Sequence, residues 1–247
     1  MSHSRSAFTT GLPGLDQVLH GIEAGDNVVW EVDDIEEYGE LILPYVQAAK
    51  ADGRHLIYFR FATHPALIPE AAGAEVHNVD PAGGFENFVR DVHAVIERAG
   101  RGAVYVFDCL SHLADVWKAD QSLGNFFMLT CPRLFDLETV TYFGLYRDKH
   151  SSYALDPIRS TTQFMLDLFR LDERLYVRPV KVQHRSREAM NTIHVRQGEA
   201  FLPVKESAVL AQILSRTQWP RLQSDRHSGY WRKLFAEAQG VSDDFMA

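Results

Sequence analysis

Carboxylates crowd one short stretch of this sequence, directly after an apolar run. Six of them lie in the ten residues from Glu31 to Glu40, which follow the apolar residues Val28–Trp30. They are Glu31, Asp33, Asp34, Glu36, Glu37 and Glu40. From Ile35 onward, apolar residues recur at helical spacing. This stretch, which we call the acidic window (residues 31–40), therefore predicts a strand end, a turn and a helix whose first turn is acidic.

The acidic window has a structural interpretation and a chemical one. Asp33 and Asp34 are good helix N-caps, and Glu36 and Glu37 follow three residues later, as in a capping box. Carboxylates in a first turn also complement the helix dipole. The alternative is an oxygen-rich site for calcium or magnesium. It would use Asp33, Asp34, Glu36 and Asp108. We favour the helix start and predict no metal.

Basic residues gather in the second half of the chain. They are Arg170, Arg174, Arg178, Lys181, His184, Arg185 and Arg187. The simpler interpretation is a solvated strand face with alternating charges, which we favour. If the segment is functional, its ligand is an acidic protein surface or a phosphorylated metabolite.

Other catalytic patterns are weak. The segment Asp108–His112 (DCLSH) places a cysteine near a histidine, but nothing in it marks a nucleophile, and no GxSxG motif is present. The eleven histidines show no HExxH spacing. Cys109 and Cys131 form no CxxC pair and lie in apolar surroundings, so we predict buried free thiols.

Composition and charge restrict the classes of partner. With 46% hydrophobic and 23% charged residues, the chain has enough apolar material for a globular core. Its net charge of −8, from 33 acidic and 25 basic residues, repels nucleic acids and anionic lipids. The polar start of the chain is no secretory signal, and no apolar run approaches a membrane span. We therefore expect a cytoplasmic protein with neither nucleic acid nor membrane as a partner.

Strands and helices alternate through the first part of the chain. Apolar runs at 55–61, 76–79, 103–107 and 139–146 predict strands, and an apolar stripe over 85–99 predicts a helix among them. Such continuous runs are typical of strands buried on both faces of a parallel sheet, so the alternation predicts an α/β fold. A further helix is predicted over 117–137. In the helix that starts near Ile35, Pro44 is expected to cause a bend or to shift the start.

The later part of the chain has a different pattern. Residues 163–201 read as short strands with polar turns, which predicts an antiparallel meander. The turns are expected at Asp172-Glu173, Arg187-Glu188 and Gln197-Gly198. We divide the chain into a flexible lead (1–10), a core domain (11–215) that closes with a surface helix over 205–215, and a linker with an amphipathic C-terminal helix (216–247). The aromatic stripe of that last helix is expected to dock on its own domain rather than on a partner.

Two motifs carry a family resemblance. The heptapeptide Thr10–Asp16 (TGLPGLD), followed by Gly21 and Gly25, resembles the opening of KaiC-like proteins, a branch of the RecA-like P-loop ATPases. Four apolar residues that end in Asp108 resemble a Walker B strand. The resemblance covers roughly residues 9–204. It implies a RecA-like, mostly parallel sheet flanked by helices, with an antiparallel C-terminal strand meander.

Departures from the family pattern argue against ATP hydrolysis. A phosphate loop needs glycines, a lysine and a following serine or threonine, but here Tyr38 occupies the lysine position and Gly39 the hydroxyl position. Ala62 and Thr63 stand where the family has a pair of catalytic glutamates. Each carboxylate about 5 Å from a phosphate adds about 3 kcal/mol of repulsion at an effective dielectric of 20. Micromolar binding supplies only about 8 kcal/mol. We therefore expect no ATP, no magnesium, no other cofactor and no ATPase activity.

The resemblance also suggests what replaces the nucleotide. We hypothesise that the strand, turn and helix persist, and that the carboxylates of the acidic window occupy the anion site themselves. In the family, the region around Lys181 reaches the nucleotide of a neighbouring subunit. Lys181 with His184, Arg185 and Ser186 loosely resembles that motif, and Arg187 follows it. Family members form rings, so a homo-oligomer is expected.

A wider resemblance suggests a biological setting. The run from Gly25 to Ser207 is similar to a KaiC-like module that precedes phosphoenolpyruvate synthase-type domains, and those catalytic domains do not fit within 247 residues. The leading hypothesis is a catalytically inactive regulatory or assembly module that binds a protein, with a phosphoenolpyruvate synthase-like enzyme as the candidate partner. One alternative is an unusual nucleotide-binding or ATP-hydrolysing protein with a site at a subunit interface. The other is a sensor of a small phosphorylated metabolite.

Overall fold

A computed structural model describes residues 8–183, 185 and 188–216 of the chain. It separates into two compact units, one that ends at Lys205 and one that begins at Glu206. The described part of the second unit is helix α7 (Ser207–Arg216), close to the surface helix predicted over 205–215. The predicted C-terminal amphipathic helix lies outside the described residues. Among those residues, no helix combines the length and apolarity needed to cross a membrane.

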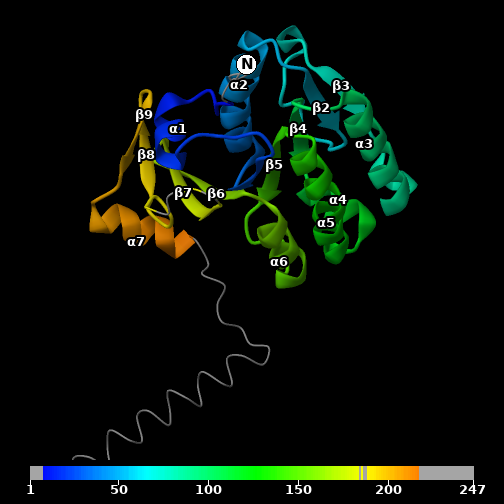
Figure 1. Cartoon of the computed structure of the whole chain (residues 1–247). Coiled ribbons are helices and arrows are strands. Elements are labelled where there is room, and N and C mark those ends of the chain that lie inside the picture. The colour runs from blue at the N-terminus through cyan, green and yellow to red at the C-terminus, as the bar shows by residue number, and fades with distance from the viewer. Residues whose placement is uncertain (1–7, 184, 186–187, 217–247) are drawn as a thin grey trace, which may run out of the picture. The chain divides into compact units, whose positions relative to one another are not determined.

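The first unit is built on one mixed sheet, which the described residues form from nine strands in the order β3-β2-β4-β5-β1-β6-β7-β8-β9 (Figure 1). The strands are β1 (Asn27–Val32), β2 (Leu56–Arg60), β3 (Glu75–Asn78), β4 (Val104–Cys109), β5 (Val140–Tyr146), β6 (Phe164–Leu171), β7 (Arg174–Val182), β8 (His194–Gln197) and β9 (Ala200–Pro203). In this order, the neighbours among β3, β2, β4, β5, β1 and β6 pair in parallel. The neighbours from β6 through β7 and β8 to β9 pair antiparallel. The predicted α/β class and the C-terminal meander are confirmed, and the sheet has a P-loop-like topology.

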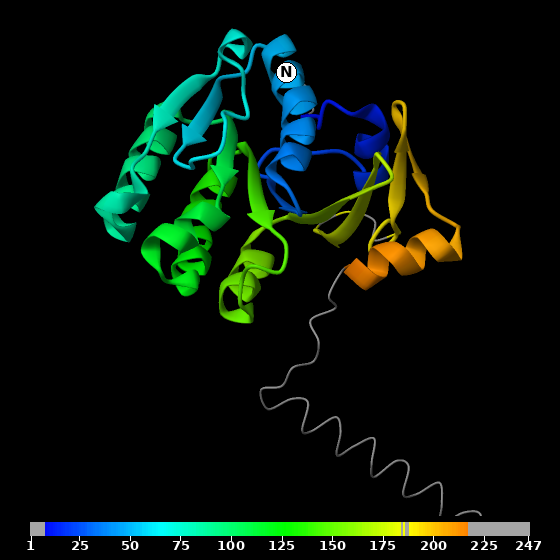
Figure 2. The ribbon, with the colours of Figure 1, turned by 180° about the vertical axis from the view of Figure 1, so that it is seen from behind.

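Helices cover both faces of this sheet. They are α1 (Pro13–Leu19), α2 (Ile35–Ala51), α3 (Phe85–Ala99), α4 (Ser111–Trp117), α5 (Asp120–Asp136) and α6 (Ser152–Thr161), with short 3-10 turns at Glu70–Ala72 and Pro81–Gly83. Helices α1 and α2 lie on one face, and α3 to α6 lie on the other (Figure 2). Each face has its own apolar cluster. Burial on both faces explains why the central strands are continuous apolar runs.

Two helix predictions need correction. The helix expected over 117–137 begins at Asp120, because Lys118 adopts a left-handed φ of 54° and ends a separate helix, α4, that the apolar pattern did not reveal. Helix α2 begins at Ile35 and continues through Pro44, so the proline does not shift its start. The cap at Asp34 sets that start instead, as described below.

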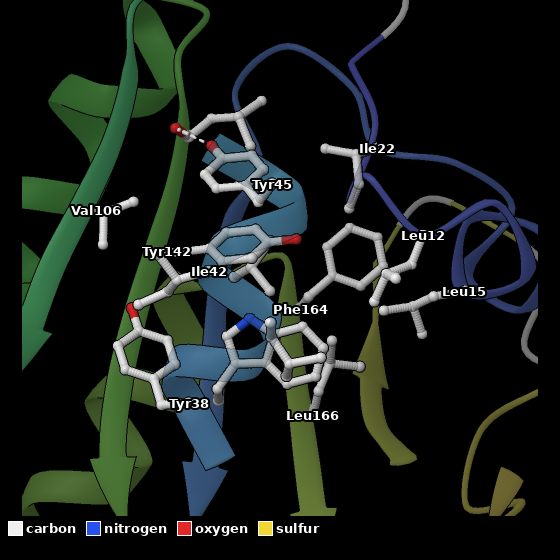
Figure 3. Close-up of a cluster of buried hydrophobic side chains, with 14 of the residues drawn as sticks. Leu12, Leu15, Ile22, Tyr38, Ile42, Tyr45, Val106, Tyr142, Phe164 and Leu166 are labelled. Carbon is white, nitrogen blue, oxygen red and sulfur yellow. Dashed lines mark hydrogen bonds between the residues drawn. The ribbon is translucent and has the colours of Figure 1, made fainter. Parts of the chain in front are cut away.

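Aromatic packing joins α2 to the sheet. Tyr45 of α2 stacks on Tyr142 of β5 with ring centroids 3.8 Å apart and planes at 2°. The Tyr45 hydroxyl donates to the Val140 carbonyl at 2.8 Å (Figure 3). Trp30 of β1 meets Tyr142 edge to face. Tyrosine is suited to this place because its ring fills the core while its hydroxyl finds a backbone acceptor.

The meander turns follow the local chemistry of the sequence. Asp172 and Glu173 both adopt positive φ, at 47° and 61°, between the paired ends of β6 and β7. That conformation is the one that a two-residue hairpin with the twist of the strands requires. Gly198, at φ 60°, turns β8 into β9. Both predicted turns are confirmed, whereas the turn at Arg187-Glu188 lies partly outside the described residues.

Close packing between α2 and β5 generates a stability prediction. A Cβ on Gly144 of β5 would lie 2.7 Å from two ring atoms of the buried Tyr38. Gly144→Ala should therefore lower the free energy of unfolding by about 1–3 kcal/mol in urea titrations, because a packed ring cannot move aside. In a Tyr38→Leu background the same change should cost clearly less. Equal costs in both backgrounds would contradict the contact.

Gly39 provides the matched control. It lies in the same helix as Tyr38, and the nearest atom to a Cβ placed there is 3.9 Å away, on Leu67. Gly39→Ala should raise the free energy of unfolding by about 0.5–1 kcal/mol, because alanine is the better helix former.

Candidate functional site

The candidate site lies at the carboxyl ends of the parallel strands. The acidic window spans the end of β1 and the start of α2, Asp108 lies near the end of β4, and Ala62 follows β2. In open α/β sheets this edge is where ligands bind, at points where neighbouring strands diverge. The structure thus brings the acidic window, Asp108 and Ala62 to one edge of the sheet, whereas Lys181 and Arg185 lie near the opposite ends of β6 and β1.

The turn after β1 is closed by a carboxylate of α2. Asp34 is the N-cap of α2, and its Oδ1 accepts the Glu36 amide at 2.9 Å. In return, Glu37 Oε2 accepts the backbone amides of Asp33 at 3.1 Å and Asp34 at 3.4 Å. The predicted capping box is confirmed for the pair Asp34 and Glu37. Glu37 is buried and its carboxylate holds two backbone donors at a helix N-terminus, where an anion would otherwise bind.

Tyr38, which the sequence analysis aligned with a phosphate-loop lysine, points into the core. Its side chain is fully buried, and its hydroxyl donates to the Phe107 carbonyl of β4 at 3.2 Å. Burial raises the pKa of the Tyr38 phenol well above its usual value, so the side chain is neutral. In Figure 3 it lies in line with Ile42 and Tyr45 on the sheet-facing side of α2. It supplies no positive charge at the turn.

Arg147, in the connection after β5, is the cation that the sequence analysis missed. Its guanidinium contacts Asp33 Oδ1 at 2.7 Å, Asp167 Oδ1 at 3.2 Å and the Glu31 carbonyl at 3.1 Å. It also donates to the Leu168 carbonyl, and the side chain is only 7% exposed. One arginine thereby ties the ends of β1, β5 and β6 together. Its place directly after a predicted strand was the signal in the sequence that could have identified it.

Two carboxyl groups share a buried space beside Arg147. Glu31 of β1 lies in register with Asp167 of β6, and both are buried. Burial, together with the neighbouring Asp167 carboxylate, raises the pKa of Glu31 to about 8. Arg178 donates to Asp167 from Nε at 2.8 Å and forms a second bond to the same oxygen. At neutral pH, Glu31 is therefore protonated, and the acidic window carries less charge than its six carboxyl groups suggest.

Asp108 is the centre of a second network. The carboxylate is fully buried and accepts the Arg60 guanidinium at 2.6 Å and the backbone amides of Phe61 and Ala62, both at 2.9 Å. The Tyr58 hydroxyl donates to its other oxygen. These donors all come from β2 and the residues after it, where the resemblance to KaiC-like proteins predicted a lost pair of glutamates. Asp108 thus fastens that segment to β4, and Thr63, the second of those positions, is exposed.

The described residues contain no group of three or more His, Cys, Asp or Glu side chains placed to hold a metal ion. The bonds of Asp108 run to β2 and those of Asp33 run to Arg147, so the contacts of these two carboxylates diverge.

The described basic residues of the meander also serve contacts within the chain. Lys181 Nζ donates to the Arg159 carbonyl at 2.5 Å and to the Thr162 carbonyl, at the C-terminus of α6, and burial lowers the pKa of this lysine. Arg185 pairs with Asp26 at 2.7 Å and stacks over the Phe164 ring. His184 and Arg187 lie outside the described residues.

The remaining window residue, Glu40, pairs with Arg170 on the surface. Cys109 and Cys131 are buried free thiols, as predicted.

No protein-family model matches the chain, and no curated protein matches it.

The buried pair of Glu31 and Asp167 predicts a pH dependence of stability. Because the pKa of Glu31 is about 8 in the folded protein and about 4.5 when unfolded, the folded state binds more protons between these values. The free energy of unfolding should therefore fall between pH 6 and 8, with a slope of up to about 1.4 kcal/mol per pH unit from this group. Glu31→Gln should remove that slope in urea titrations. Glu40→Gln, a surface control, should keep it, and an unchanged slope in Glu31→Gln would contradict the assignment.

The stability of an Asp108 variant tests whether this carboxylate has a structural role. Asp108→Asn should lower the free energy of unfolding by about 3 kcal/mol, because the partly buried Arg60 and two backbone donors lose a charged, fully buried acceptor. Asp115→Asn, at an exposed position of α4, should change it by less than about 0.5 kcal/mol. A fully stable Asp108→Asn variant would show that the carboxylate does not contribute to the free energy of folding. A catalytic role would then be open again.

Proposed function

We propose that this chain is a catalytically inactive member of the KaiC-like branch of RecA-like ATPases and works as a regulatory or assembly module through protein interaction. The observation that carries this proposal is that the backbone amides of Asp33 and Asp34 both donate hydrogen bonds to Glu37 Oε2. A carboxylate of the chain itself satisfies the donors that a bound phosphate would use. The family assignment itself rests on the TGLPGLD heptapeptide and agrees with the P-loop-like sheet topology.

Three further features support the loss of nucleotide chemistry. Tyr38 contributes no charge at the lysine position, because it is buried and neutral. Arg147, which could otherwise attract a phosphate, is already paired with Asp33 and Asp167. Asp108 is bonded to Arg60 and to backbone amides, so it has no free geometry for a magnesium ion. A fold that keeps its sheet while filling its ligand edge with its own side chains is suited to a binding role.

The partner proposed is a phosphoenolpyruvate synthase-like enzyme, and the support for it is the resemblance of residues 25–207 to the module that precedes such catalytic domains. We also propose a homo-oligomer, because members of the same family form rings. A cytoplasmic location follows from this partner.

Calorimetric titration with ATP and ADP, with and without magnesium, tests the inactive site. We expect no binding heat up to about 1 mM nucleotide. In a Glu37→Ala variant, loss of the capping box should lower stability by about 1 kcal/mol. That variant should still show no micromolar affinity, because Tyr38 cannot replace a lysine. Micromolar binding by the unmodified chain would overturn the proposal and favour an interface nucleotide site.

Co-expression with the phosphoenolpyruvate synthase-like enzyme of the same organism tests the interaction. We expect the two proteins to co-elute in size-exclusion chromatography at about 10 µM each. A chain that ends at residue 216 identifies whether the last 31 residues contribute. Independent elution of the full chain and the enzyme would reject this partner, whatever the outcome of the nucleotide titration.

A further inference from the structure

Three side chains outside the networks described above form a linear hydrogen-bonded series. Ser111 Oγ lies 2.7 Å from His150 Nε2, and His150 Nδ1 lies 2.6 Å from Asp120 Oδ1. Ser111 is the first residue of α4, directly after β4, and Asp120 is the first residue of α5. His150 lies in the connection between β5 and α6. Three separate segments therefore converge at the same carboxyl edge of the sheet (Figure 1).

The partners of this series determine its proton arrangement. The Tyr146 amide donates to Ser111 Oγ at 2.8 Å, so the serine hydrogen can point toward either of two neighbouring acceptors, His150 Nε2 and the Cys109 sulfur. The second oxygen of Asp120 accepts both the Ser151 amide at 2.7 Å and the Ser151 hydroxyl at 2.6 Å. Asp120 is thereby held with Oδ1 toward the imidazole. This assigns the hydrogen of the neutral ring to Nδ1 and leaves Nε2 as a base beside the serine.

The order and placement of the three residues match those of a nucleophilic site. Serine, aspartate and histidine follow one another along the chain, with the serine at a turn from a buried parallel strand into a helix. Ser111 and the His150 side chain are 1% and 3% exposed. Burial raises the pKa of the neighbouring Cys109 to about 11, so that thiol is uncharged and a poor nucleophile at neutral pH.

We propose that Ser111, His150 and Asp120 form a nucleophilic triad that cleaves small activated acyl esters. Ser111 Oγ attacks the ester carbonyl while its proton moves to His150 Nε2, and an Oγ–C bond forms. The C–O bond to the alcohol then breaks, and His150 returns the proton to the departing oxygen. Water, deprotonated by His150, releases the acid and restores the Ser111 hydroxyl. Asp120 stays ionised and positions the ring.

The test is covalent labelling of the full chain with a small alkyl fluorophosphonate, which forms an Oγ–P bond and releases fluoride. We expect mass spectrometry of the digested protein to locate one label on Ser111. His150→Ala should slow labelling by about 100-fold or more, as expected for the loss of a general base. Asp120→Asn should slow it in the same direction. Ser160→Ala, at an exposed serine of α6, should label like the unmodified chain.

Thermal melting of each variant establishes that it is folded, and His150→Gln replaces His150→Ala if the latter is not. Hydrolysis of p-nitrophenyl acetate, lost in Ser111→Ala and retained in Ser160→Ala, would support turnover at the same site. The proposal is overturned if the folded, unmodified chain takes no label on Ser111. It is equally overturned if a folded His150 variant labels at the unmodified rate, because the series would then be only a structural link between α4, α5 and the β5–α6 connection.

Discussion

Backbone amides at the turn from β1 into α2 need an acceptor, because the first N–H groups of a helix have no partner within it. In this chain Glu37, one turn into the same helix, supplies that acceptor to Asp33 and Asp34, while Asp34 caps Glu36. The donors of the turn thus have an acceptor within the chain. A capping box normally stabilises a helix start by about 1 kcal/mol.

Tyr38, the residue after Glu37, packs its side chain against the sheet. Tyr38 turns its ring into the core, and Gly144 on β5 leaves the space that the ring fills. The same face of α2 continues with Ile42 and Tyr45, which pack against β5 (Figure 3). The helix is therefore anchored by apolar burial along its length and by the capping box at its start. A lysine at the position of Tyr38 would have to be buried without a partner.

Charge at the carboxyl edge is balanced within the chain in a similar way. Arg147 joins the ends of three strands, and Glu31 carries a proton because burial and Asp167 disfavour its ionised form. Two hydrogen-bond networks start near the end of β4 and run to different segments. Asp108 bonds toward β2, whereas Ser111, three residues later, bonds toward His150 in the β5–α6 connection. Both networks tie loops to the sheet, and the second also places an imidazole nitrogen beside a serine hydroxyl group.

The sequence by itself determined the parts of this protein that depend on near neighbours along the chain. Apolar runs identified the central strands, Asp172 and Glu173 marked a hairpin, and the spacing of Asp34 and Glu37 identified the capping box, because each rests on local backbone geometry. The break at Lys118 escaped this reasoning, since a left-handed residue there has no clear signal.

Only the tertiary structure decided which distant side chains meet. It brought Arg147 to Asp33, paired Glu31 with Asp167 so that one of them is protonated, and placed His150 between Ser111 and Asp120. The order of strands in the sheet determines these meetings, because parallel neighbours can be more than a hundred residues apart, as β1 and β5 are. No periodicity or spacing within a short stretch of sequence encodes that order.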